Sequence, residues 1–243
     1  AAAHGAALAD GAGLVVGPLL KESVAQVATL AGTVPTLALN NLDAAGLPPP
    51  GLFQFALAPE DEARQGAGRA VAEGRTRALA LVPDTEWGRR MLTAFMPALE
   101  ALGGTVLAYR FYDPAATDYT AQLQRLLLVD ESRARHRQLS ANVGVELEFE
   151  PRRRTDVDFI FLAATTASGR LIRPQLRFLY AGDIPTYATS AIYPPGSAGD
   201  ADLDGIMFPD APALVGGDVR AAALRSALGR SWPPGAQARM RFY

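Results

Sequence analysis

The 243-residue sequence contains no cysteine and only two histidines, and these absences exclude several kinds of chemistry. Without cysteine, this chain can form no disulfide, thiol nucleophile or thiolate metal site. His4 and His136 lie far apart in the sequence, so a histidine-based metal cluster or a serine triad has little to work with. We therefore expect no catalytic residue, no metal site and no cofactor, and hydrolysis by a pair of carboxylates stays open as an alternative.

An excess of one charge and long apolar runs are also lacking. Basic residues number 23 against 25 acidic ones, and the formal net charge is −2. Such a chain produces no general field toward nucleic acid or an anionic membrane, so we expect neither as a direct partner. No apolar run reaches the length of a membrane span, and the alanine-rich start (1–8) lacks the basic flank of a signal peptide. The chain starts without Met and ends without a terminal signal, and we expect it to be a fragment.

Seven short apolar runs, most of them bounded by Gly, Pro or Asp, are typical of strands that are buried on both faces. These runs are 14–16, 36–39, 78–82, 105–109, 159–163, 186–190 and 206–208. Between several of them, apolar residues recur with the spacing of an amphipathic helix. Repeated strand–helix–strand units predict an α/β fold in which helices flank mostly parallel sheets.

Capping residues indicate where four successive helices begin. The expected N-terminal residues are Pro59, Asp84 or Thr85, Asp118 and Ser168. Two prolines disturb this pattern, because Pro97 and Pro174 lie inside segments with helical spacing. A proline within a helix lacks the N–H that its turn requires, so each should kink its helix or shift the boundary.

Two stretches interrupt the alternation of strand and helix. The first, 42–51, contains three consecutive prolines and is predicted to be a surface loop. The second is the long polar segment 129–157, which exceeds the usual length of a plain connection. We expect it to be an insertion that carries its own helix around 132–139 and a short strand near 145–149.

The most polar part of the sequence lies within this insertion, where alternating acids run directly into three arginines. The candidate partner-binding residues are Glu148, Glu150, Arg152, Arg153 and Arg154. One interpretation is a solvated loop whose charges compensate one another internally. The other is a docking surface, since closely spaced opposite charges orient a partner and fix its register. The residues alone leave both open.

Two motifs that could hold a ligand fail in detail. The glycines at 11, 13 and 17 flank a strand instead of following one, which is the wrong geometry for a dinucleotide pyrophosphate. Asp200, Asp202, Asp204 and Gly205 resemble the opening of a calcium loop, but Ala211 stands where the bidentate acid is needed. We interpret this stretch as an acidic loop before a strand.

The order of elements resembles a type I periplasmic binding protein, the two-lobed fold of bacterial amino-acid receptors. The phrase from Phe53 to Glu62 resembles the passage from the first lobe into the second, and 80–88 resembles the turn that opens the second lobe. More specific phrases resemble the LppC/LpoA family of penicillin-binding protein activators. They are Val16-Gly-Pro-Leu-Leu-Lys21, Leu37-Ala-Leu-Asn40, 59–64, Leu147-Glu-Phe-Glu-Pro-Arg-Arg-Arg154, 158–161, Arg173-Pro-Gln-Leu-Arg-Phe178 and 187–190.

This resemblance implies an outer-membrane lipoprotein that faces the periplasm and is lipidated on a cysteine upstream of this chain. Its implied role is to bind a class A penicillin-binding protein and stimulate peptidoglycan synthesis, with peptidoglycan itself as a second candidate ligand. By fold analogy, one incomplete lobe comprises 1–58 plus 211–243, and the other comprises 59–210. We expect a regulator that is not an enzyme.

The resemblance also places a cleft between the lobes. Its candidate residues are Gly17, Pro18, Leu19, Asn40, Trp87 and Ser190. Amino-acid receptors tend to present hydroxyl residues after this glycine, whereas Leu19 and Leu20 offer no side-chain hydrogen bond. A closed or empty cleft is therefore expected. A solute-binding receptor is the alternative, and a hydrolase or transferase that uses an unrecognised carboxylate pair ranks last.

Overall fold

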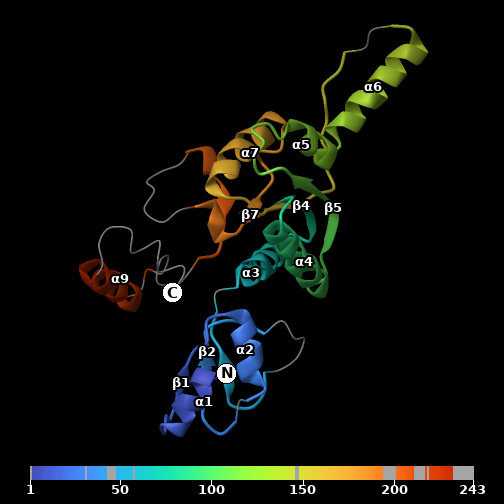
Figure 1. The fold of residues 1–243 in the computed structure, drawn as a ribbon. Helices are drawn as coiled ribbons and strands as arrows, with labels where there is room; N and C mark the ends of the chain where they lie inside the picture. Colours follow the sequence, from blue (N-terminus) through green and yellow to red (C-terminus); the bar gives the residue numbers. More distant parts are fainter. Residues whose placement is uncertain are drawn as a thin grey trace. The chain divides into compact units, whose positions relative to one another are not determined.

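The computed structural model describes residues 2–30, 32–42, 48–56, 58–145, 148–193, 201–210, 217 and 219–231 (Figure 1). The chain divides into two compact units, 1–58 and 59–243. Most of 211–243 lies outside the described residues, as do 43–47 of the predicted proline loop and Glu146 of the charged segment. The expected return of 211–243 to the first lobe stays a prediction.

The first unit contains a parallel sheet of three short strands in the order β1-β2-β3. Its elements are α1 (Ala2–Ala9), β1 (Val15–Val16), α2 (Lys21–Ala28), β2 (Thr36–Ala38) and β3 (Leu52–Gln54). A small core of Val24, Ala38 and Leu52 joins α2 to one face of this sheet. Strand β3 was absent from the strands expected from the sequence.

The opposite face of this sheet carries exposed apolar side chains. The expectation that every strand is buried on both faces is therefore wrong for this sheet. The register aligns Val16 with Leu37 and Leu37 with Phe53, so these three side chains form one row across the sheet. Val16 and Phe53 are exposed. Because side chains alternate along a strand, the row lies opposite the face that α2 covers.

The second unit contains a five-stranded parallel sheet in the order β5-β4-β6-β7-β8. Its strands are β4 (Arg77–Pro83), β5 (Thr105–Tyr112), β6 (Phe159–Leu162), β7 (Thr186–Ala188) and β8 (Ile206–Met207). Its α-helices are α3 (Pro59–Ala72), α4 (Glu86–Ala101), α5 (Thr120–Leu127), α6 (Val129–Val143), α7 (Thr166–Phe178) and α9 (Val219–Ser231), and two short 3-10 turns are η1 (Ser190–Ile192) and η2 (Ala201–Leu203). The predicted α/β class, with parallel sheets flanked by helices, is confirmed.

Alternation along the central strands distributes their side chains between two hydrophobic cores. Leu79 and Leu81 of β4 face the core built with α5 and α7. Ala78, Ala80 and Val82 face the core built with α3 and α4. A strand covered on both faces appears in the sequence as a continuous apolar run, which is why this sheet could be predicted.

The N-terminal ends of the helices follow the expected capping chemistry in part. The Thr85 hydroxyl accepts a hydrogen bond from the Gly88 N–H at 3.2 Å and caps α4, as predicted. The prediction for Ser168 is wrong: Thr165 caps α7, and Ser168 is buried inside the helix. Asp118 also falls one position too early, because Tyr119 is the N-cap of α5 and the Asp118 carboxylate accepts from the Thr120 N–H at 2.8 Å.

Both internal prolines are accommodated without a change of helix boundary. Pro97 lies within α4 and Pro174 lies within α7, and each helix continues beyond its proline. The strand expected near 145–149 is wrong for the residues described there, which have no strand geometry. Among the described helices, none combines the length and apolar character needed to cross a membrane.

Candidate partner-binding arm

The insertion forms an arm that consists of α6 and a return segment, 148–157, which has no regular secondary structure. Figure 1 shows α6 projecting away from the sheet and from α5 and α7 of its own unit. Leu128 has a left-handed conformation (φ 58°) and serves both as the C-cap of α5 and as the N-cap of α6. This single residue turns the chain from the body of the unit into the arm.

The far end of α6 is closed by Gly144, which has a φ of 74° and donates its N–H to the Ser140 carbonyl at 2.9 Å. Glycine adopts this left-handed conformation without steric cost, so it suits a helix C-terminus. The return segment then lies along α6. The Phe149 ring stacks on His136 at 4.2 Å between centroids, and the Arg152 N–H donates to the Ser132 hydroxyl at 3.2 Å.

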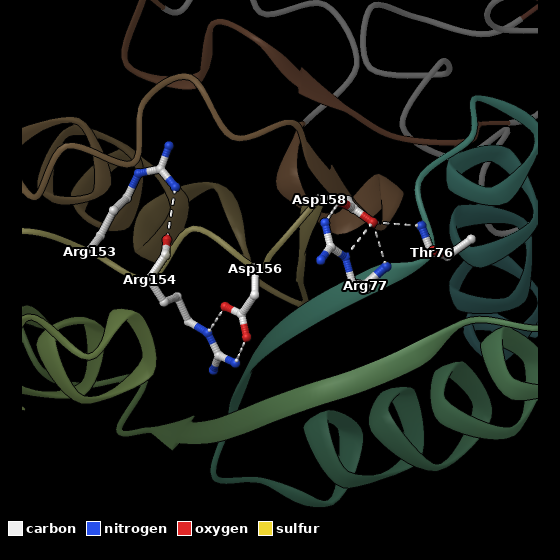
Figure 2. A network of polar contacts seen from close by, with 6 residues as sticks. All are labelled: Thr76, Arg77, Arg153, Arg154, Asp156 and Asp158. Atoms are coloured by element: carbon white, nitrogen blue, oxygen red, sulfur yellow. Dashed lines mark hydrogen bonds and ion pairs between the residues drawn. The ribbon is translucent and has the colours of Figure 1, made fainter.

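Arg153 anchors the base of the arm to the C-terminal turn that follows α7. Its guanidinium donates to the Tyr180 carbonyl at 2.6 Å, to the Asp183 carboxylate at 2.7 Å and to the Arg154 carbonyl at 3.1 Å. Figure 2 shows the last of these bonds. The Arg153 side chain is only 19% exposed, so most of it is already in contact with the protein.

Arg154 closes the base of the arm on the other side. Its backbone N–H donates to the Leu127 carbonyl at 2.9 Å, and its guanidinium forms two bonds to the Asp156 carboxylate, at 2.7 and 2.8 Å (Figure 2). Such paired bonds are the strong geometry for arginine and carboxylate. The hydrogen bond from Arg154 lowers the pKa of the Asp156 carboxyl.

Asp158 fastens the end of the return segment to the start of β4. Its carboxylate accepts from the Arg77 guanidinium at 2.8 Å and from the backbone N–H groups of Arg77 and Thr76 at 2.9 and 3.1 Å (Figure 2). Hydrogen bonding from the Arg77 side chain is the main cause that lowers the pKa of Asp158 to about 2. The carboxylate therefore stays charged in the folded protein at neutral and mildly acidic pH.

Replacing Asp158 by asparagine is expected to reduce the free energy of unfolding by about 1–2 kcal/mol at pH 7, a value lowered by solvent screening because Arg77 is half exposed. Since folding depresses this pKa, the stabilisation is complete above about pH 4 and is lost as the pH falls toward about 2. Urea unfolding of both proteins between pH 7 and pH 2 measures this. The difference between them should shrink across the acid range.

The surface pair Arg89–Asp84 provides a control for this prediction, because more than half of each side chain is exposed. Asp84→Asn should change the free energy of unfolding by less than about 0.5 kcal/mol. An Asp158→Asn variant that is no less stable than Asp84→Asn at pH 7 would contradict the anchoring role of Asp158.

The five candidate residues thus separate into two groups. The guanidinium groups of Arg153 and Arg154 bind carboxylates and carbonyls of the same unit. For these two residues, this agrees with the interpretation that the charges of the segment compensate one another internally. Glu148, Glu150 and Arg152 are exposed, and no ion pair involves them in the described part of the chain. A docking role for any of the five stays a prediction.

The structure adds four exposed apolar side chains on the far half of the arm that the sequence interpretation missed. They are Leu139, Val143, Val145 and Phe149, with exposed fractions between 38 and 56%. Leu139 and Val143 are four residues apart and lie on one face of α6. Apolar residues spaced four apart also occur on helices that face a core. In this sequence, only the polar residues around Leu139 and Val143 indicate that the pair is exposed.

The candidate cleft residues are distributed over both units. In the first unit, the Asn40 side chain donates to the Leu19 carbonyl at 2.9 Å, close to Pro18, whose bond to Gly17 is cis. Leu19 is exposed. In the second unit, Trp87 lies in the first turn of α4. The shared cleft stays a prediction.

Ser190, the remaining cleft candidate, already has a partner within its unit. Its N–H and its hydroxyl donate to the Glu62 carboxylate at 2.6 and 2.8 Å. A hollow of about 540 Å³ in the second unit lies elsewhere, between α3 and the strands β7 and β8, and its described lining includes none of the cleft candidates.

Comparison with solved structures places the chain among periplasmic-binding-protein-like α/β domains. The C-domain of LpoA (YraM) from Haemophilus influenzae, described as a regulator of PBP1A, superposes with a TM-score of 0.67 at 21% identity, over 93% of this chain and 64% of that one. A putative branched-chain amino acid ABC transporter protein from Chromobacterium violaceum gives 0.56 at 26% identity, over 81% and 54%.

Sequence comparison identifies the family. The family described as LppC putative lipoprotein matches residues 4–243, and the chain belongs to this LppC family. Penicillin-binding protein activators LpoA from Photobacterium profundum and Edwardsiella piscicida are 29% and 32% identical to it, over 85% and 86% of this chain. The chain spans about a third of the length of these relatives (34% and 32%). The resemblance read from the sequence is confirmed.

Proposed function

We propose that this chain is a module of a non-catalytic periplasmic regulator, an outer-membrane lipoprotein that binds and activates a class A penicillin-binding protein in peptidoglycan synthesis. The observation that carries the proposal is the LppC match over residues 4–243, together with relatives named as penicillin-binding protein activators. Lipidation would occur on a cysteine outside this chain, which contains none.

Activation by contact requires a difference in affinity between two states of the synthase. A regulator that binds the active conformation more tightly shifts the population toward it, and equal affinity for both states would shift nothing. The contact must therefore form with a surface that changes during activation. The arm, which projects from its unit in Figure 1, supports this proposal as a contact element.

The intact lipoprotein in detergent should bind a purified class A penicillin-binding protein and raise its rate of glycan polymerisation or peptide cross-linking on lipid-linked substrate. The physical reason is the population shift described above. Polymerisation and cross-linking are followed with labelled substrate, and binding by surface plasmon resonance. Heat-denatured lipoprotein is the control, and an unchanged rate without binding refutes the proposal.

A solute-binding receptor is the second candidate, and the structural similarity to the Chromobacterium violaceum protein favours it. Two contacts weigh against it: the Ser190 donors already bind Glu62, and the Asn40 amide binds the Leu19 carbonyl. A ligand at 100 times its Kd would stabilise the protein by about 2.7 kcal/mol. Thermal unfolding with amino acids, sugars and muropeptides would reveal such a ligand.

A further inference from the structure

We propose that the far half of the arm is the docking element, and that Leu139, Val143, Val145 and Phe149 enter an apolar depression on the synthase. This inference rests on the proposed function and names the part of the chain that performs it. The four side chains come from consecutive parts of the arm: α6, the residue after Gly144, and the return segment. Exposed apolar groups gathered on one element of a soluble domain indicate an interaction site.

The four side chains lie on the same half of the arm for identifiable reasons. Leu139 and Val143 share a face of α6 because they are four residues apart. Phe149 is held over His136, which is three residues before Leu139, by the ring stacking at 4.2 Å. Val145 follows directly after the left-handed turn at Gly144. The apolar groups therefore lie on the half of the arm that is farthest from its base.

Charged side chains of the return segment stand on either side of Phe149 in the sequence. Among the described residues, no ion pair involves Glu148, Glu150 or Arg152, whereas Arg135 of α6 pairs with Glu131 at 3.6 Å. By contrast, the arginines of the arm base and of the start of β4 are paired with carboxylates. An apolar centre with a charged rim is the usual composition of a protein interface.

Both signs of charge occur in this rim, and this decides between a protein and a membrane as the partner. Glu148 and Glu150 would be repelled by an anionic lipid surface, whereas a protein can present a complementary group to each sign. The synthase surface should therefore carry a carboxylate opposite Arg152, cationic groups opposite the two glutamates, and an apolar depression beside them.

The base of the arm favours binding because it limits the freedom lost on docking. Arg153, Arg154 and Asp158 fasten the return segment to the turn after α7, to the end of α5 and to the start of β4. An element that is already ordered loses less conformational entropy when a partner immobilises it. These residues act as positioning residues, and the exposed far half makes the contact.

The test is the double substitution Leu139→Gln with Val143→Gln in the intact lipoprotein, assayed for binding and stimulation of the synthase in detergent. Glutamine keeps the helix propensity of α6, and both sites are more than half exposed, so the far-UV spectrum and the Tm should not change. Binding should weaken roughly 10- to 100-fold, as expected when central interface side chains are truncated. Stimulation should fall in parallel.

The matched control is Phe178→Gln, because Phe178 is 76% exposed at the end of α7 and lies outside the arm. It should bind and stimulate as the unmodified protein does. If the double variant also does so, the docking proposal is wrong while the proposed function stands. If the unmodified lipoprotein neither binds nor stimulates the synthase, the proposed function itself fails.

A second variant, Arg152→Glu, tests the charged rim. It should slow association with the synthase and reduce the dependence of the association rate on salt, because exposed charges act mainly on encounter. If both arm variants bind the synthase normally in detergent and lose stimulation only in anionic vesicles, the arm contacts lipid, and the protein-docking proposal is overturned.

Discussion

Replacing Phe161 by alanine is expected to lower the free energy of unfolding of the second unit by about 3–5 kcal/mol. Phe161 is fully buried in β6, and its ring stacks on Phe95 of α4 at 4.1 Å between centroids, with the planes only 7° apart. Truncation removes this contact and leaves a cavity between the sheet and the helices, because a packed core relaxes only partially. Urea unfolding followed by circular dichroism measures the loss.

Phe178→Ala is the matched control for this prediction, since it removes the same ring from an exposed position. Its effect should stay within about 0.5 kcal/mol. A loss below about 1 kcal/mol for Phe161→Ala would mean that the core between β6 and α4 is not packed as described.

The same substitution, glycine to alanine, should have opposite effects at two helical positions. At Gly88, in the first turn of α4, a Cβ atom would overlap the Pro83 carbonyl oxygen and the Pro83 ring. Backbone atoms cannot move away as a flexible side chain can, so Gly88→Ala should cost about 2–3 kcal/mol. At Gly68 of α3 a Cβ atom meets nothing within 4 Å, and alanine should stabilise by about 0.5–1 kcal/mol.

Thermal unfolding of both glycine variants tests this pair of predictions. The Tm should fall for Gly88→Ala and rise for Gly68→Ala relative to the unmodified protein. Equal shifts in the same direction would show that close contact with Pro83 does not explain the glycine at position 88.

The sheet of the second unit could be predicted because its strands are covered on both faces. A strand such as Phe159–Leu162 has no exposed position, so its sequence is a continuous apolar run. Strand β3 was missed for the opposite reason. It spans only Leu52–Gln54, follows a proline-rich stretch and has the exposed Phe53 at its centre, so neither length nor pattern distinguishes it from a loop.

The strand expected near 145–149, of which residues 145, 148 and 149 are described, shows why alternation can mislead. Apolar residues at every second position fit a half-buried strand, and they fit equally an extended segment that touches one neighbour. Here that neighbour is a helix, on which the Phe149 ring stacks through His136. A strand needs a hydrogen-bonded partner strand, and sequence spacing carries no information about whether one is available.

The charged segment was identified from the sequence, but the division of its arginines was not. Arg153 binds Asp183, thirty residues further along the chain, and Arg154 binds Asp156, two residues away. Arg152, which directly precedes them, has no such carboxylate in the described part of the chain. Three consecutive identical residues are equivalent as sequence, and only the positions of the carboxylates in the folded structure separate the two that anchor from the one that is exposed.

The close approach of the two ends of the arm has a consequence for how this region can vary. The Leu127 carbonyl, directly before the turn into α6, accepts the Arg154 N–H at 2.9 Å. A segment whose two ends are held together by a hydrogen bond of the scaffold can be lengthened, trimmed or exchanged at a small cost in conformational entropy. The reason is that the cost of closing a loop grows only slowly with its length. Related chains can therefore differ in arm size while keeping the same scaffold, and a graft placed between positions 128 and 153 should leave the underlying sheet intact.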